Sequence, residues 1–206
     1  MMMKTVLSLG AVAVLASCAT TASAPSREET LQVIKSSFKD RGIAKVDRLN
    51  QSDLQQVCSD VSLNKKDLAK DVRERLEKQQ MTTVKFPADG KFLGDFKEGE
   101  KIAQSGRGLQ WNDTAKTVAG GNCYACHELS PQEISFGNIG PSLKGYGKLR
   151  GNSETVVKYT WGKIWNTHAY NACSSMPRFG DAGILTEAQS KDVMALLLDP
   201  NSPVNK

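Results

Sequence analysis

The sequence is poor in aromatic residues and in histidine. Only 6% of its 206 residues are aromatic, and two are histidines. Lysine and arginine exceed the acidic residues, for a formal charge of +5, but they are scattered rather than gathered in a stripe. Nucleic-acid binding depends on such a stripe, so we expect no nucleic-acid partner. No run of about 18 apolar residues follows the N-terminal segment, so we expect no membrane-spanning helix after it.

Strand-rich segments and internal repeats are also missing. Apolar residues make up 39% of the chain and charged residues 24%, a balance that permits a globular core and argues against wholesale disorder. The periodic signal that remains is helical. We predict a mainly α protein in three parts: a signal peptide (1–24), a helical extension with its linker (25–94) and a C-terminal domain (95–206).

The N-terminus has the pattern of a secretory signal peptide. Lys4 gives a positive start, and the apolar segment 6–15 is too short for a transmembrane helix. Two cleavage sites compete. Leu15-Ala16-Ser17-Cys18 resembles a bacterial lipobox, in which Cys18 would carry a lipid, whereas Ala22-Ser23-Ala24 is an A-x-A site. Either site predicts export to the periplasm, where disulfides persist, with a lipid on Cys18 as the one membrane contact.

Helix-start signals recur along the extension. Ser26 with Glu29, and Ser52 with Gln55, have the spacing of capping boxes, and Asn64 is a candidate cap for a third helix. The extension has too few large apolar residues to hold a core alone, so it should pack on something else. Apolar residues follow the caps at helical spacing: Leu31, Ile34 and Phe38 with Gly42 as a stop, then Leu54, Val57 and Val61, then Leu68, Val72 and Leu76.

Three further helices are expected in the C-terminal domain. One spans 96–104, one runs from about Ser153 to Trp165, and one starts at a capping box of Thr186 with Gln189 and ends at Asp199-Pro200. Glycine-rich loops and a cysteine motif separate the first two.

The segment Cys123-Tyr124-Ala125-Cys126-His127 is a C-x-x-C-H motif. The thiols of Cys123 and Cys126 can add to the two vinyl groups of a haem, which places His127 under the iron as proximal ligand. The motif therefore predicts one covalently attached haem c. The alternatives are a thioredoxin-like dithiol, which normally lies between a strand and a helix, and half of a zinc site.

The second axial ligand must come from farther along the chain. Met176 is the candidate, because a soft thioether stabilises ferrous iron and raises the reduction potential. His168 is the rival, since it is the other histidine of the chain. Met81 and Met194 are expected to be packing residues.

Three more residues are candidates for supporting the haem site, either by holding His127 or by contacting the haem. The carbonyl of Pro141 can accept a hydrogen bond from Nδ1–H of His127 and fix its ring, although the proline could serve only a turn. Trp161 and Trp165 could wall the haem or donate an indole N–H to a propionate, and core packing explains them nearly as well.

Two of the five cysteines lie outside both the lipobox and the haem motif. These are Cys58 and Cys173, and an oxidising compartment favours a disulfide between them. The bond would tie the extension to the loop that carries Met176, and closing so long a loop stabilises by roughly 4 kcal/mol before strain. The alternative is a pair of buried free thiols.

Residues from about 96 to 199 resemble a class I cytochrome c domain, here with an N-terminal helical extension. Four segments carry a closer resemblance: GGNCYACH, GNIGPSLKGYG, VVKYTWGKIWNTHAYNACSSMPRFG and ILTEAQSKDVMALLLDP. They are similar to the SoxX family, the monohaem subunits of the bacterial sulfur-oxidation cytochrome. The resemblance covers about half the chain. It carries the family's haem cysteines onto Cys123 and Cys126, and its axial ligands onto His127 and Met176.

The resemblance implies a heterodimer with a SoxA-like haem subunit. Such a complex, an L-cysteine S-thiosulfotransferase, joins thiosulfate to a cysteine of the carrier protein SoxYZ and releases two electrons. This chain would be its electron-transfer subunit and would pass electrons to a soluble cytochrome c, while the catalytic residues belong to the partner. A stand-alone periplasmic electron carrier and a haem sensor with an open axial position are the alternatives.

The modest charge bears on the way a partner would bind. Without a basic patch, long-range attraction to an acidic partner is weak, so apolar burial must supply most of the affinity. We expect the partner to cover apolar residues of the extension: Leu54, Val57, Leu68, Val72 and Leu76.

Overall fold

The structure, a computed structural model, describes residues 25–206, and they are mainly helical. Seven α-helices and no strand occur in this range, where a single bridge between Arg41 and Ala44 is the only β-type pairing. The prediction of a mainly α protein is confirmed. The predicted signal peptide, with Cys18, lies outside the described residues. No helix within 25–206 combines the length and the apolar character needed to cross a membrane.

The chain divides into two compact units, Met1–Ser37 and Phe38–Lys206. The described part of the first unit consists of α1 (Arg27–Ser37) and the two residues before it. The capping box is present, since Glu29 N donates to Ser26 Oγ at 3.2 Å and Ser26 N donates to Glu29 Oε2 at 2.7 Å. The boundary expected between residues 94 and 95 falls inside the second unit.

The expected extension of the first helix through Phe38 to Gly42 is wrong. The helix ends at Ser37, and the following segment forms a turn closed by the bridge between Arg41 and Ala44. Gly42 lies in that turn with a φ of +54°, a left-handed conformation that suits glycine. The turn therefore takes the backbone hydrogen bonds that a longer helix would have used.

The second unit begins with α2 (Asp53–Leu63) and α3 (Lys70–Met81). The predicted capping box of Ser52 with Gln55 starts α2. Asn64, however, does not cap the third helix. It is the C-cap residue of α2, and its Nδ2 donates to the carbonyl of Asp60 at 2.7 Å. Helix α3 begins only after Ala69.

A small apolar cluster joins these helices to a distant loop. Leu54 of α2 and Leu76 of α3 are buried together with Ala172. Beside them Cys58 and Cys173 form a disulfide, with their Cα atoms 5.4 Å apart. The predicted disulfide is thus confirmed, and the expectation that the extension packs on something else is confirmed for α2 and α3.

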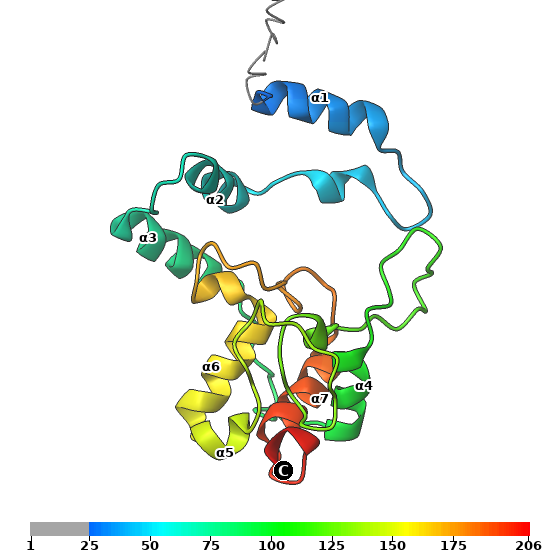
Figure 1. The fold of residues 1–206 in the computed structure, drawn as a ribbon, viewed down its shortest axis with the longest axis vertical. Coiled ribbons are helices and arrows are strands. Elements are labelled where there is room, and N and C mark those ends of the chain that lie inside the picture. Colours follow the sequence, from blue (N-terminus) through cyan, green and yellow to red (C-terminus); the bar gives the residue numbers. More distant parts are fainter. Residues whose placement is uncertain (1–24) are drawn as a thin grey trace, which may run out of the picture. The chain divides into compact units, whose positions relative to one another are not determined.

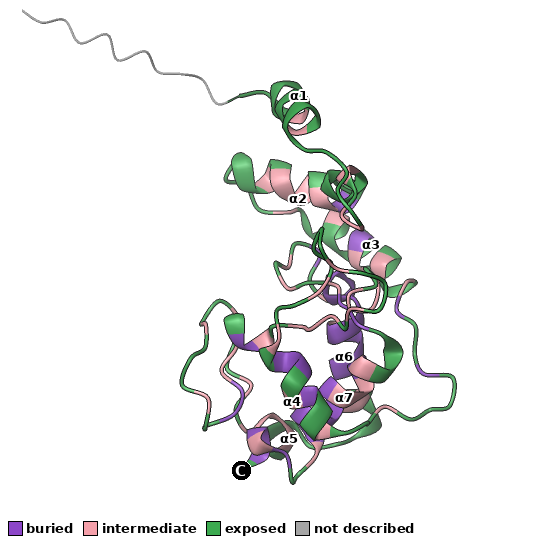
Figure 2. Cartoon of the chain, turned by 90° about the vertical axis from the view of Figure 1, so that its right-hand side faces the viewer, coloured by how far each residue is buried: buried purple, intermediate pink, exposed green. Residues whose placement is uncertain are grey.

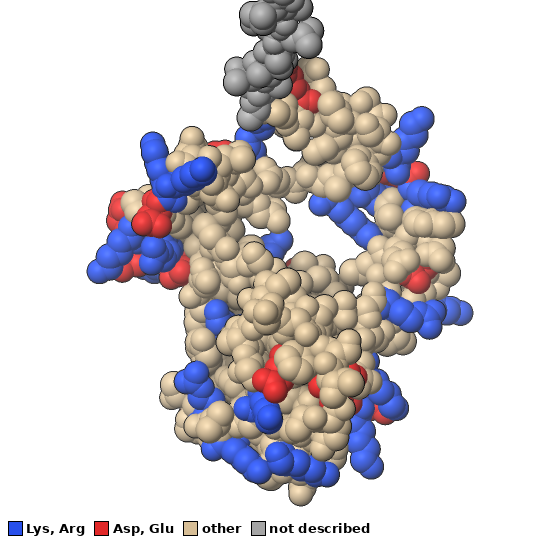
Figure 3. Space-filling model, viewed as in Figure 1, with Lys and Arg blue, Asp and Glu red and all other residues tan. Residues whose placement is uncertain are grey.

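The same cluster corrects the predicted partner surface. The five apolar residues assigned to a partner are covered within the chain, either buried or half-buried in the cluster: Leu54, Val57, Leu68, Val72 and Leu76. The sequence pattern marks an apolar helix face but does not say what covers it. On the outer side of α3, acidic and basic side chains are interspersed (Figure 3), as in the exposed pair of Lys70 with Glu74.

The main core lies around α7 (Glu187–Leu198), which packs against α4 (Phe96–Gln104) and α6 (Glu154–Trp165) (Figure 1). Side chains from Val193 to Leu198 are all buried (Figure 2). Gly99 permits the close approach of α4, because a Cβ there would lie 2.1 Å from the carbonyl oxygen of Asp192. These three helices match their predicted positions.

One helix was not expected. The glycine-rich loop after the cysteine motif contains the short helix α5 (Tyr146–Arg150). Gly145 and Gly151 bound it with φ values of +68° and +72°. Five residues are too few to show a helical period, and the flanking glycines favour the interpretation of the whole segment as a loop.

Candidate functional site

The C-x-x-C-H motif forms a compact turn at the end of α4. Residues Cys123–Ala125 make a 3₁₀ turn, preceded by Asn122 with a φ of +47°. Hydrogen bonds of 2.9 Å join Gly121 N to the carbonyl of Ile102 and Asn122 N to that of Ser105. His127 N donates to the carbonyl of Cys123 at 2.9 Å. The turn therefore holds the two cysteines and the histidine in a fixed order beside the core.

The two cysteines of the motif are free thiols. Cys123 packs against the main core, and desolvation raises the pKa of its thiol to about 12. A dithiol redox pair needs the opposite shift, because the thiolate is the reacting form. The motif also lies in a turn after a helix, not between a strand and a helix. Within residues 25–206 no group of three or more His, Cys, Asp or Glu side chains is arranged to hold a metal, so neither alternative gains support.

The imidazole of His127 is held from one side. Its Nδ1 lies 2.7 Å from the carbonyl oxygen of Pro141, and since a carbonyl only accepts, Nδ1 carries the proton. This is the predicted hydrogen bond. In that tautomer Nε2 has a free lone pair, which is the form that binds a metal. Gly140 lies against the ring face, and its N–H donates to the carbonyl of Cys126 at 2.8 Å.

Gly140→Ala tests this arrangement. A Cβ at this position would lie 2.1 Å from Cε1 and 2.4 Å from Nδ1 of His127, so the ring must move away from Pro141. We expect loss of the Nδ1 hydrogen bond and a decrease of about 1–3 kcal/mol in the free energy of unfolding. The nitrogen chemical shifts of the His127 imidazole report the hydrogen bond, and urea unfolding measures the change in stability. Asn138→Ala, at an exposed position of the same loop, is the control; unchanged His127 shifts in Gly140→Ala would contradict the packing.

The loop between the motif and Pro141 exposes apolar side chains. Gly137 N donates to the carbonyl of Tyr124 at 2.8 Å, which places this loop beside the motif. Three of its side chains are exposed: Ile134 at 90%, Ile139 at 78% and Phe136 at 44%. Exposed apolar groups gathered in one loop are typical of a surface that another group or protein covers.

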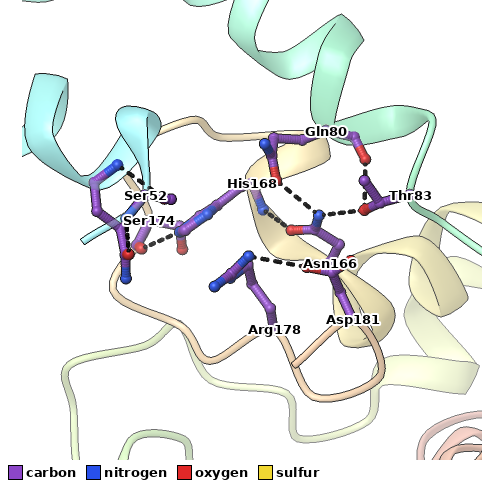
Figure 4. A network of polar contacts seen from close by, with 9 residues as sticks. Ser52, Gln80, Thr83, Asn166, His168, Ser174, Arg178 and Asp181 are labelled. Atoms are coloured by element: carbon purple, nitrogen blue, oxygen red, sulfur yellow. Dashed lines mark hydrogen bonds and ion pairs between the residues drawn. The ribbon is translucent and has the colours of Figure 1, made fainter. Parts of the chain in front are cut away.

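Met176 and His168 have different surroundings. Met176 is half-buried and packs against the main core, as Cys123 does. His168 is buried, burial lowers its pKa, and its Nε2 lies 3.1 Å from the carbonyl oxygen of Ser174 (Figure 4). Nε2 of His168 is therefore paired with a backbone carbonyl, whereas the part of the chain that the structure describes contains no hydrogen bond to the Met176 thioether. Of the two packing methionines, Met194 is fully buried, but Met81 is exposed, so that expectation is wrong for Met81.

Trp161 and Trp165 stack on one another, with ring centroids 5.6 Å apart. Their indole N–H groups differ in hydrogen bonding. Trp161 Nε1 donates to the carbonyl of Lys85 at 2.8 Å. Trp165 Nε1 is buried and has no hydrogen-bond partner among the described residues. Buried indole N–H groups almost always have a partner, so Trp165 has the donor that a bound acidic group could use.

One polar contact within the motif had no sequence signal. The hydroxyl of Tyr124 donates to Glu100 Oε1 of α4 at 2.9 Å and accepts from Ser130 N at 3.2 Å. Burial raises the pKa of Glu100, and burial with the hydrogen bond to Glu100 raises that of Tyr124. The tyrosine thereby fastens the motif to α4.

Comparison with known proteins gives one distant similarity. No protein-family model matches this chain. A protein of Aquifex aeolicus (strain VF5), described as an uncharacterized lipoprotein, is 41% identical over 132 residues, which are 63% of this chain. The chain spans 61% of the length of that curated relative. The relative's description states no ligand and no activity.

Proposed function

We propose that this protein is a periplasmic haem c electron-transfer protein of the class I cytochrome c type. In this proposal Cys123 and Cys126 would hold the haem through thioether bonds, and His127 and Met176 would bind its iron. The observation that carries the proposal is the C-x-x-C-H turn in which Nδ1–H of His127 is hydrogen-bonded to Pro141, with Nε2 left free. The haem would supply a one-electron couple between ferric and ferrous iron.

The residues around the motif fit such a group. The side chain of Ile139 is exposed and lies next to Gly140, which is against the ring of His127, so a porphyrin edge there would shield it. The unpartnered N–H of Trp165 is a donor for an acidic substituent such as a propionate. Cys123 is half-buried against the main core, where an uncharged thioether is compatible with the apolar surroundings.

The chain's own residues then set the properties of the site. Pro141 fixes the tautomer of His127 and makes its Nε2 a stronger donor. With His127 and Met176 both bound to the iron, the chain would offer no open position for a substrate. We therefore assign it electron transfer rather than substrate chemistry, and no catalytic residue.

The physiological role follows from the resemblance to the SoxX family. In this role the protein is the electron-transfer subunit of a thiosulfate-oxidising complex, an L-cysteine S-thiosulfotransferase. It accepts the electrons released when thiosulfate is joined to a cysteine of a SoxYZ-like carrier, beside a SoxA-like haem subunit, and passes them to a soluble cytochrome c. The lipobox around Cys18 and the lipoprotein description of the relative both support a lipid anchor in the periplasm.

A stand-alone electron carrier is the second candidate. It is favoured by one finding, that the five apolar residues expected to meet a partner are buried or half-buried within the chain: Leu54, Val57, Leu68, Val72 and Leu76. A partner is therefore not needed to cover them. What supports a partner is instead the apolar loop beside the motif, with Ile134 the most exposed of its side chains at 90%.

Reconstitution distinguishes the thiosulfate-oxidising complex from the stand-alone carrier. This protein and a SoxA-like haem subunit, each alone and both together, are mixed with thiosulfate and the carrier protein, and the reduction of an added cytochrome c is followed. We expect turnover only from the pair. Ile134→Glu should weaken association about tenfold, the equivalent of about 1.4 kcal/mol, without loss of haem. Leu63→Glu, at a residue 80% exposed at the end of α2, is the matched control.

Two results would contradict the assignment. Full thiosulfate-dependent turnover by this subunit alone would overturn the division of labour. A protein that stays monomeric at all concentrations of the haem partner, measured by sedimentation, would favour the stand-alone carrier.

A further inference from the structure

The segment 166–176, here called the methionine loop, leads from the end of α6 to Met176. Residues far earlier in the sequence hold it by direct bonds. The disulfide joins Cys173 to Cys58 of α2, at a sequence separation of 115. Ala172 N donates to Glu77 Oε1 of α3 at 3.1 Å. The loop is thus attached to α2 and to α3 at neighbouring residues.

A polar contact at the start of the loop forms a third attachment (Figure 4). The side chain of Asn166 is fully buried, and its Nδ2 donates to Gln80 Oε1 at 3.0 Å and to Thr83 Oγ1 at 2.8 Å. Its Oδ1 accepts from His168 N at 3.1 Å, which caps the 3₁₀ turn Thr167–Ala169. A buried amide whose donors and acceptor are all used fixes its neighbours firmly.

Ser174 transmits this order to Met176. Its carbonyl oxygen lies 3.1 Å from Nε2 of His168, and its Oγ accepts from Met176 N at 3.2 Å. Thr167 Oγ1 also donates to Ser174 Oγ, at 3.2 Å. The backbone of Met176 is therefore connected through one serine to residues that the extension holds.

We propose that α2 and α3 act as a clamp that positions Met176. Four residues would then determine how firmly its thioether stays bound to the iron: Cys58, Cys173, Glu77 and Gln80. This rests on the proposed role of Met176 as axial ligand. These four residues act on Met176 through the loop and not on the iron, so they are positioning residues. The extension is then part of the redox site and is not a separate docking arm.

The physical reason is loop entropy. A thioether–metal bond is weak enough that an exogenous ligand competes with it whenever the loop has freedom to move away. Attachments at both ends of the loop remove that freedom before the bond forms, which favours the bond without adding a contact to the metal. Loss of an attachment should therefore be seen in two places: faster amide exchange in the loop and easier displacement of Met176.

The test uses the full-length holoprotein and two different variants. Cys58→Ser/Cys173→Ser removes the covalent attachment, and Glu77→Ala removes the hydrogen bond to Ala172 while the disulfide stays. Glu74→Ala is the control, since Glu74 lies on the same helix in an exposed pair with Lys70. Hydrogen exchange is measured for the methionine loop and for α7, and imidazole titrated into the oxidised protein reports displacement of Met176.

We expect exchange in the methionine loop to rise about tenfold in both variants and imidazole to bind about tenfold more tightly, the equivalent of about 1.4 kcal/mol. Exchange in α7 should be unchanged, and Glu74→Ala should behave as the wild type. The clamp is refuted if both variants leave loop exchange and imidazole affinity at wild-type values, or if α7 is loosened as much as the loop, since that pattern means a general loss of stability.

The outcomes also separate this inference from the proposed function. If the purified protein carries no covalent haem, the proposed function fails, and hydrogen exchange alone decides whether the clamp orders the loop. If haem is attached but the variants behave as the wild type, the proposed function stands and the clamp does not.

Discussion

Replacing Cys123 and Cys126 by serine is expected to abolish covalent haem attachment. Thioether bonds survive acid extraction, whereas a haem held only by axial ligands is removed. The wild-type chain should therefore keep its haem after denaturation and give a haem-stained band. Either single serine variant should retain one thioether and stain weakly, and the double variant should lose its haem to acid completely.

The control is the pair Cys58→Ser and Cys173→Ser. These cysteines are joined to each other in the structure and lie outside the motif, so their removal should leave haem staining unchanged. Extraction of free haem from the wild-type protein would refute the attachment, and so would the absence of any bound haem after expression with a haem-attachment system.

Helix boundaries were predictable wherever a signal is local. The boxes formed by Ser52 with Gln55, and by Thr186 with Gln189, each satisfy two backbone N–H groups with side chains three residues apart, so the sequence alone identifies them. Asn64 shows the limit of this reasoning. An asparagine can end a helix as well as start one, and here its side chain bonds back to Asp60.

The predictable part of the site is equally local. The motif predicts the roles of Cys123, Cys126 and His127, and the glycine–proline pair that ends 14 residues after His127 supplies the carbonyl that Nδ1 meets in the structure. The disulfide was predictable from the number of cysteines, without any knowledge of geometry. In both cases the chemistry of the residue type limits the choice to few partners.

The contacts between segments far apart in the sequence were not predictable. Asn166 bonds to residues 83 and 86 positions earlier, and the hydroxyl of Tyr124 reaches Glu100 across 24 positions. Neither pair has a spacing or composition that marks it. The packing of Ala172 against Leu54 and Leu76 was equally unpredictable, because an apolar helix face is compatible with any apolar neighbour.

Met176→Ala is expected to open the ligand site. No hydrogen bond to the thioether of Met176 occurs within residues 25–206, whereas Nε2 of His168 already faces the carbonyl of Ser174. Removal of the thioether should abolish the thioether–iron band at the red edge of the oxidised spectrum. The reduced protein should change from no carbon monoxide binding to stoichiometric binding. Met176 is half-buried against the core, so a loss of about 2 kcal/mol in unfolding free energy should accompany the change.

His168→Ala is the matched variant. It leaves the carbonyl of Ser174 without its imidazole partner, so stability should fall by about 1–3 kcal/mol. The thioether–iron band should nevertheless remain, although the loosened methionine loop should exchange its amides faster. If His168→Ala instead opens the site to carbon monoxide and Met176→Ala does not, His168 is the axial ligand and Met176 is a packing residue. If both do so equally, the oxidised spectra decide: a thioether–iron band in the wild type and in His168→Ala, but not in Met176→Ala, identifies Met176 as the ligand, and absence of the band from the wild type identifies His168.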